Sequence, residues 1–440
     1  MRFTNRQLRQ LIIPLIVEQL LAVTVGMADS IMTASVGEAA VSAVSLVDTI
    51  MILMINIFAA LATGGAVVTG QYIGQGRPEQ SSKAADQLIL FIGVLAVGIT
   101  AIVYLGKYWI LHGIFGKIEA DVMYHSNIYL MIVTASIPFI ALYNGGAALF
   151  RAMGDSKTPM KTALLMNAVN IVGNAILIYG LKLGVAGAAI PTLCSRILAA
   201  VVILMLLKNQ RLTVHLSRHF TFRFDGHLVR KIMNIGVPNG LENSMFQIGK
   251  ILVLSLVSGF GTASIAANAV SNTIATFQVL PGTAMGYAVL TVISQCIGAK
   301  DYRQAKYYTK KLLLITYGAM FLCNVIVVLV LPGILFAYNL SDVTAKLTRQ
   351  IIFYHALCCV TIWPLSFTLP NSLRASNDVK FAMVTSIVSM WVFRILFSYI
   401  LGQTLGLGVF GIWVAMTIDW LFRAICFTIR YLRGKWQMKS

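Results

Sequence analysis

Carboxylates inside apolar stretches are the residues of this sequence whose chemistry is most informative. Asp29 lies deep in the first such stretch, where charge is costly and is usually kept for function or pairing. The second half of the chain repeats the first, and its position equivalent to Asp29 holds Val253, so a structural need shared by both halves does not explain Asp29. A buried carboxylate can take up a proton or a sodium ion. We predict that Asp29 is a cation site; the alternative is an acid at a helix end that contacts water.

Three asparagines follow one another in a later apolar stretch, at positions 167, 170 and 174. Asn170 and Asn174 are one helical turn apart and share a face. Amides in a bilayer can coordinate a cation or hydrogen-bond a neighbouring helix. We therefore assign Asn170 and Asn174 either to a cation site or to helix packing.

Glu18 and Glu242 form a symmetric pair, because each follows a proline, Pro14 or Pro238, by four residues. A proline frees a backbone carbonyl and bends its helix. The two glutamates either satisfy polar groups near these bends or act in substrate binding and gating. Glu18 and Asp29 are eleven residues apart and should share a helix face, about 16 Å from each other.

Asp419 and Arg423 have the i, i+4 spacing of an intrahelical pair. We predict a structural ion pair, which Arg394 or Arg196 could join. Asp48 is expected at the start of the second helix, where an acid favours the helix N-terminus.

Sequence motifs of enzymes and ATPases are absent. The chain has no GxxxxGK[ST], HExxH or G-x-S-x-G segment, its six histidines are scattered, and its six cysteines lack CxxC spacing. We predict no enzyme activity, no metal and no cofactor. Any transport is then facilitated or driven by an ion gradient.

Composition places these residues in a membrane. Of 440 residues, 58% are hydrophobic and 11% charged, and a soluble domain of this size needs more surface charge. The net charge of +19 does not indicate nucleic acid, because the bases lie in short loops between apolar stretches. The apolar stretches predict twelve transmembrane helices: 9–32, 47–70, 88–110, 126–148, 161–181, 185–207, 235–258, 270–294, 312–334, 350–371, 382–402 and 407–429.

The distribution of Lys and Arg predicts the orientation. With the N-terminus inside, the inner segments hold 25 of these residues and the outer segments hold five. This bias predicts a multi-pass protein of the cell (inner) membrane with both termini in the cytoplasm.

The chain consists of two copies of one unit. Equivalent positions of the two copies are 223 or 224 residues apart in the sequence. Arg151-Ala-Met-Gly-Asp155-Ser-Lys157 recurs as Arg374-Ala-Ser-Asn-Asp378-Val-Lys380 at 223, and LGVAG from 183 recurs as LGVFG from 407 at 224. Each copy has six helices, so both copies cross the membrane in the same direction. The fold class is therefore an all-α polytopic membrane protein of two pseudo-symmetric six-helix bundles. We place them at 1–207 and 234–440, joined by a cytoplasmic linker at 208–233.

Several segments together resemble the multidrug and toxic compound extrusion (MATE) family. They are PLIVEQLLAVTVGMADSIMTASVGEAAVSAVS, GQYIGQGRPEQSSKA, ALFRAMGDSKTP, GLKLGVAGAA, GVPNGLENSMFQIGK and SLRASND, and they extend over nearly the whole chain. The resemblance implies two bundles that alternate between inward- and outward-facing forms. It also implies export of organic cations and other amphiphiles in exchange for protons or sodium.

The resemblance also implies residue roles. Asp29 matches the family's helix 1 acid, which takes the coupling cation. Asn170 matches a helix 5 asparagine, but Asn174 stands where one branch has a second aspartate. Another branch has an acid on helix 7, around whose place this chain has Phe246 and Gln247, so Gln247 joins the candidates for substrate binding and gating.

The expected partners are a small amphiphilic or cationic organic substrate and the lipid bilayer, with no nucleic acid, and we expect a monomer. An alternative is an exporter or flippase of lipid-linked or polysaccharide intermediates. Such proteins often have more basic cavities than the few intramembrane bases here predict. A third class, an intramembrane enzyme, lacks support because no paired catalytic acids or nucleophile motif is present.

Overall fold

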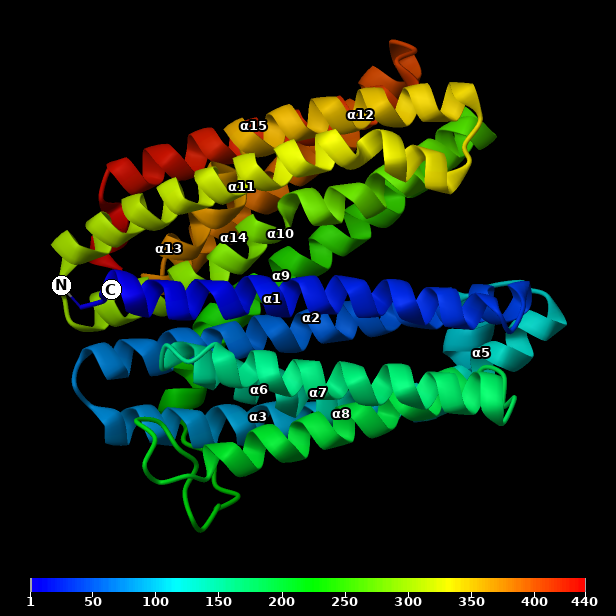
Figure 1. Ribbon diagram of the computed structural model, residues 1–440. Coiled ribbons are helices and arrows are strands. Elements are labelled where there is room, and N and C mark those ends of the chain that lie inside the picture. The colour runs from blue at the N-terminus through cyan, green and yellow to red at the C-terminus, as the bar shows by residue number, and fades with distance from the viewer. Residues whose placement is uncertain (1, 440) are drawn as a thin grey trace. The chain divides into compact units, whose positions relative to one another are not determined.

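The protein is built from long helices, as a computed structural model that describes residues 2–439 shows (Figure 1). No strand occurs in these residues. The first eight helices are α1 (Asn5–Ala34), α2 (Glu38–Gly74), α3 (Pro78–Leu105), α4 (Lys107–Trp109), α5 (Ala120–Thr134), α6 (Ile137–Ala152), α7 (Lys157–Asn174) and α8 (Ala186–Leu207). The others are α9 (Gly226–Val257), α10 (Thr262–Gly298), α11 (Tyr302–Tyr338), α12 (Asp342–Thr361), α13 (Pro370–Ala375), α14 (Val379–Ser389) and α15 (Gly408–Leu432).

Twelve membrane spans account for nearly all of these helices. Ten are single helices that are long and apolar enough to cross a bilayer, within the described part of the chain. Two more are bent pairs, α5 with α6 at 46° and α12 with the helical segment Pro364–Ala375 at 59°. A proline in the first turn of the second member of each pair, Pro138 or Pro364, accounts for the bend. The predicted fold class and the prediction of about twelve helices are confirmed.

The helices extend beyond the apolar stretches that predicted them. The second predicted helix, 47–70, is part of α2, which begins at Glu38 and ends at Gly74. Hydropathy marks only the part of a helix that lies in hydrocarbon, whereas backbone hydrogen bonding continues through the interface. The prediction that Asp48 starts this helix is therefore wrong, since it lies ten residues inside α2.

The chain divides into two compact units. The first unit is Arg6–Gly240, and the second is Leu241–Ser440 together with Met1–Asn5. The first part of α9 therefore belongs to the first unit. The segment 208–233 that we predicted as a linker includes the start of α9 at Gly226.

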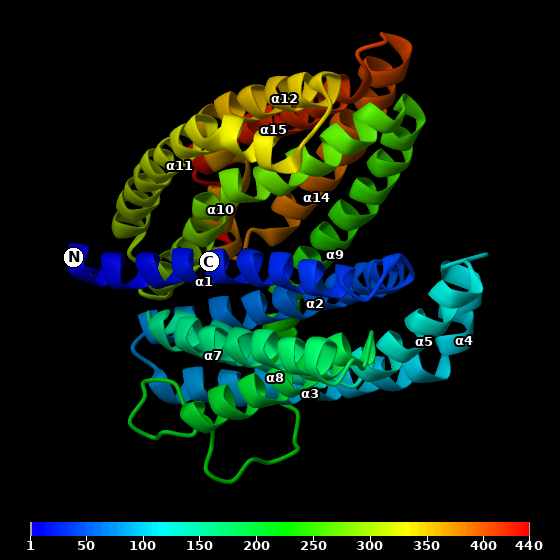
Figure 2. The ribbon, with the colours of Figure 1, turned by 45° about the vertical axis from the view of Figure 1, so that its right-hand side comes forward.

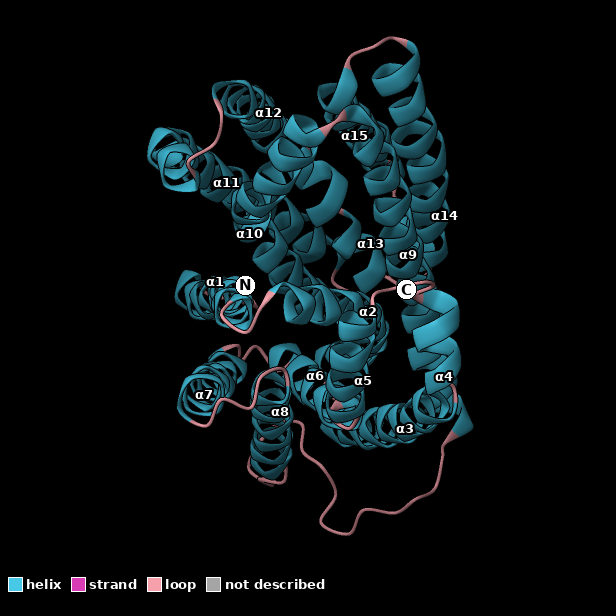
Figure 3. Cartoon of the chain, turned by 90° about the vertical axis from the view of Figure 1, so that its right-hand side faces the viewer, coloured by secondary structure: helices cyan, strands magenta, loops and turns pink. Residues whose placement is uncertain are grey.

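In the first unit, α2 packs against α3, α5 and α6, and α8 packs against α6 and α7 (Figure 3). Small residues allow the closest approaches. A Cβ atom on Gly64 of α2 would lie 2.5 Å from the carbonyl oxygen of Ile232 and 2.9 Å from the amide nitrogen of Gly236, both on α9. Backbone contact of this kind is how membrane helices gain packing energy without a hydrophobic effect between them.

In the second unit, α10 is the buried centre. It packs against α11, α12 and α13, and Figure 2 shows it alongside α11. Gly282 of α10 makes room for the indole of Trp363, because a Cβ atom there would lie 2.1 Å from the ring. Met320, Cys358, Cys359 and Trp420 complete an apolar cluster around Trp363.

Several π-helical turns interrupt the helices. Two of them, Ala175–Gly180 and Tyr399–Thr404, occupy equivalent positions of the two copies, at the ends of equivalent spans. A third, Met390–Leu396, falls where the repeat offset changes from 223 to 224. A π-turn accommodates one extra residue in a helix, so it explains this change of offset.

Candidate functional site

The carboxylate of Asp29 on α1 is held by two amides of α7. Asn170 Nδ2 donates to both carboxylate oxygens at 2.9 Å, and Asn174 Nδ2 donates to Oδ1 at 2.6 Å. Asn170 and Asn174 are both buried, and Asp29 is half-buried. The structure thus brings together the three residues that we assigned to a cation site.

Oxygen atoms of the same amides complete a polar cluster. Asn174 Oδ1 is buried and has no hydrogen-bond partner within residues 2–439. Asn170 Oδ1 accepts a hydrogen bond from Thr192 Oγ1 of α8 at 3.3 Å. Carboxylate, amide and hydroxyl oxygens are the ligands that hard cations prefer. The cluster can therefore hold a proton on Asp29 or a cation such as sodium among these oxygens.

A second carboxylate of the first unit lies near this cluster. Asp48 Oδ1 accepts a hydrogen bond from Tyr129 Oη at 3.1 Å. Arg196 of α8 donates to Ser136 Oγ at 2.8 Å and is close enough to interact electrostatically with Asp29 and Asp48. When both carboxylates are ionised, they outnumber the one guanidinium and leave this region with one excess negative charge. The sequence alone did not indicate Tyr129 or Thr192, because hydroxyls in apolar helices are common.

Glu18 and Glu242 both form ion pairs with arginines that sequence reasoning did not assign. Arg151 Nη2 lies 2.5 Å from Glu18 Oε1 in the first unit, and Arg374 Nη2 lies 2.8 Å from Glu242 Oε1 in the second. All four side chains are largely buried. The two arginines occupy equivalent places in the repeated RAMGDSK and RASNDVK segments. The repeat itself was therefore the signal that could have paired them with the symmetric glutamates.

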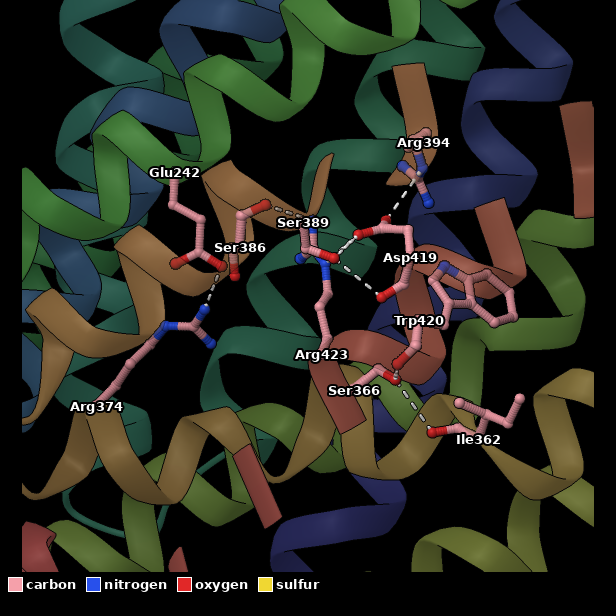
Figure 4. A network of polar contacts seen from close by, with 10 residues as sticks. All are labelled: Glu242, Ile362, Ser366, Arg374, Ser386, Ser389, Arg394, Asp419, Trp420 and Arg423. Carbon is pink, nitrogen blue, oxygen red and sulfur yellow. Dashed lines mark hydrogen bonds and ion pairs between the residues drawn. The ribbon is translucent and has the colours of Figure 1, made fainter. Parts of the chain in front are cut away.

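Asp419 is the centre of a buried network in the second unit (Figure 4). Arg423 Nε donates to Asp419 Oδ1 at 3.0 Å, and Arg394 Nε lies 3.3 Å from Oδ2. Ser389 Oγ also donates to Oδ1. Asp419 and Arg423 are thus paired, with Arg394 as the third member. Arg196 lies in the first unit and belongs to the surroundings of Asp29.

Gln247 is half-buried on α9, one residue after Phe246. The ring of Phe246 lies under three cations: Lys250 Nζ at 4.8 Å, Arg394 Cζ at 4.7 Å and Arg423 Cζ at 5.9 Å from its centroid. Gln247 belongs to the second unit, whereas Asp29 belongs to the first. No group of three or more His, Cys, Asp or Glu side chains in the described residues could hold a metal ion.

Twelve spans and a buried carboxylate–amide cluster define a multi-pass membrane protein. The chain belongs to the MatE family of transporters, whose model matches residues 14–176 and 238–400. The two matches begin and end at equivalent positions of the two copies, so they coincide with the internal repeat.

Curated relatives are similar over almost their whole length. The uncharacterized transporter YisQ of Bacillus subtilis is 26% identical over 433 residues, which cover 97% of this chain and 94% of YisQ. The probable multidrug resistance protein NorM of Thermotoga maritima is 24% identical over 463 residues and covers 99% of this chain and 94% of NorM.

Solved structures have the same fold. An outward-facing multidrug resistance MATE family transporter of the MOP superfamily superposes with a TM-score of 0.91 at 21% identity, covering 99% of this chain and 96% of that one. A MOP superfamily transporter from Pyrococcus furiosus gives 0.89 at 20% identity, with 99% and 96% covered. At these identities the likeness establishes the fold alone.

Proposed function

We propose that this protein is a secondary-active antiporter of the cell (inner) membrane. It exports small amphiphilic organic compounds, cationic ones among them, in exchange for protons or sodium ions. Exchange proceeds by alternating access, with both termini in the cytoplasm. Family membership, the lack of a nucleotide-binding motif and the multidrug resistance names of several relatives support this proposal.

The observation that carries the proposal is the cluster of Asp29, Asn170 and Asn174. A carboxylate inside a membrane span is costly unless it is paired or neutralised. The two asparagines supply hydrogen bonds but no opposite charge, and the nearby Arg196 interacts with both Asp29 and Asp48. Binding of a proton or a metal cation neutralises the carboxylate. The site with a free Asp29 carboxylate and the site with a bound proton or cation therefore differ by a full charge. This difference in charge couples ion binding to a change of conformation.

The coupling role belongs to the first unit because the second copy lacks the acid. Val253 replaces Asp29 at the equivalent position. One binding site per molecule follows, whether the ion is a proton or sodium. The half-buried position of Asp29 leaves it accessible to an ion, whereas Asp419 is fully buried and already neutralised by two arginines.

The test is dye efflux from membrane vesicles with imposed pH and sodium gradients in turn. Wild type is compared with Asp29→Asn, which keeps the shape of the side chain and removes its charge. One of the gradients should drive efflux in wild type and so identify the ion. Asp29→Asn should lower the driven rate by on the order of tenfold or more, since a lost charge interaction of about 1.4 kcal/mol already gives tenfold.

The matched control is Asp121→Asn, the same chemical change at an exposed residue in the first turn of α5. It should transport like wild type. Equal driven efflux by Asp29→Asn and wild type would reject the ion site. Failure of both gradients to move any of several cationic dyes in wild type would reject multidrug export and favour a dedicated exporter of metabolites or lipid-linked intermediates.

A further inference from the structure

The second unit contains a cavity of about 350 Å³ with a basic lining. Lys250 of α9 and Arg394 of the π-turn Met390–Leu396 both line it, and no carboxylate is among its described lining residues. Asn268, Asn272 and Thr276 of α10 add neutral polar groups. The cavity is large enough for a small organic molecule.

The charges around this cavity do not balance. Arg394 and Arg423 share the single carboxylate of Asp419, which leaves one positive charge over. Lys250 adds another, because it forms no salt bridge within the described residues and is exposed. The ring of Phe246, which contacts all three cations, offsets only part of this charge.

The repeat shows how this cavity differs from the Asp29 cluster. At the offset of 224 that holds in the first two spans of each copy, Asp29 and Asp48 correspond to Val253 and Asn272, and both of these residues line the cavity. Arg394, which also lines it, lies on the span equivalent to the one that carries Asn170. The cavity therefore occupies the place of the acidic cluster in the second copy, with both acids replaced by neutral residues and an arginine added.

We propose that this cavity binds the anionic group of an organic amphiphile, such as a carboxylate, sulfonate or phosphate ester. Lys250 and Arg394 hold the anion, and Asn272 can donate a further hydrogen bond. Leu254, Trp413 and Met416 provide an apolar wall for the body of the ligand. This inference rests on the proposed export function and adds a substrate class to it: anionic amphiphiles beside the cationic ones that the first unit can attract.

The test is equilibrium binding to the full chain in phosphatidylcholine nanodiscs by isothermal titration calorimetry, with empty nanodiscs as the blank. Three probes share one apolar body: 2-naphthoate, 2-naphthylmethanol and 2-naphthylmethylammonium. Wild type should bind naphthoate at least tenfold more tightly than the neutral alcohol. Binding needs no ion gradient, so a protein that fails the transport test still gives a result here.

Two variants and a control assign the binding to this cavity. Lys250→Gln, at an exposed residue without an ion pair, should weaken naphthoate binding by on the order of tenfold. Asn272→Asp restores the acid of the first copy and should weaken naphthoate binding while strengthening that of the naphthylammonium. Lys346→Gln removes the same charge from an exposed site on α12 and should change neither.

A second arm identifies the source of the anion. Nanodiscs that also contain phosphatidylglycerol present an anionic lipid headgroup to the same cavity. Unchanged naphthoate affinity in them supports a dissolved organic anion, and competition supports a lipid headgroup at the same anion site. Equal binding of naphthoate and naphthylammonium by wild type, or wild-type affinity of Lys250→Gln for naphthoate, would overturn the proposal.

Discussion

At the scale of single residues, the two amides beside Asp29 have unequal roles. Asn170 donates to both carboxylate oxygens and also accepts from Thr192, so it links α1, α7 and α8. Asn174 donates to one carboxylate oxygen and keeps a buried oxygen without a partner in the described chain. Asn170 is therefore the residue that orients the carboxylate, and Asn174 offers the additional oxygen to a bound ion.

We predict that Asn170→Ala lowers ion-driven efflux by on the order of tenfold, because hydrogen bonds to a charged group contribute about 1.5 to 3 kcal/mol each. Efflux in vesicles under the gradient that drives wild type measures the effect. Asn167→Ala is the matched control, since Asn167 is a buried asparagine on the same helix, whereas the amides that donate to Asp29 are those of Asn170 and Asn174. Equal losses in the two variants would mean that α7 packing, and not the carboxylate contact, is what transport requires.

The residues missed from the sequence are those whose role depends on a distant partner. The sequence was sufficient to group Asp29, Asn170 and Asn174, because an acid and two amides are unusual within apolar stretches. Arg151 and Arg374 did not stand out, because each lies at the end of a span among loop bases that also set orientation. Only folding brings them onto Glu18 and Glu242, which are distant in the sequence in each case.

At the scale of elements, the crossing of α2 and α9 depends on two glycines. The backbones meet at Gly64 and Gly236, where the Cα atom of Gly236 lies 3.1 Å from the place of a Cβ atom on Gly64. Backbone atoms cannot move aside as a flexible side chain can. The crossing therefore tolerates no side chain at Gly64 unless the two helices separate.

We predict that Gly64→Ala destabilises the protein by about 1 to 3 kcal/mol, the usual cost of overpacking. Thermal unfolding of the purified protein in detergent, with intrinsic fluorescence as the readout, measures this change. Gly98→Ala on α3 is the control, because a Cβ atom there meets nothing within 4 Å. It should be neutral or slightly stabilising, since alanine favours a helix over glycine. A Gly64→Ala variant as stable as Gly98→Ala would show that the two helices cross less closely.

At the scale of the whole molecule, hydropathy and the repeat predicted the helical class and the number of spans. Hydropathy and the repeat did not locate the bends within α5–α6 and α12–α13, which depend on Pro138 and Pro364. They also did not predict the π-turns, which depend on the neighbouring groups that satisfy freed backbone carbonyls. They also could not show the basic cavity, because Lys250 and Arg394 lie on different spans, far apart in the sequence. In the sequence, a single intramembrane base indicates a charge that is paired with an acid. Two bases that face one cavity can instead form a binding site for an anion.

The orientation of the protein in the membrane decides which residues face the cytoplasm. Six spans in each copy require both halves to face the same way, and the excess of inner bases places the termini inside. In a variant without the six native cysteines, single cysteines replace four exposed lysines, at 117 and 346 on the expected outer side and at 83 and 300 on the inner side. A membrane-impermeant maleimide added to intact cells should label positions 117 and 346, and should reach 83 and 300 only after permeabilisation. The reverse pattern would place both termini outside and would contradict the orientation that the lysines and arginines predict. If positions 117 and 300 were labelled in intact cells while 83 and 346 were protected, the two copies would cross the membrane in opposite directions. That result would contradict the even number of spans assigned to each copy.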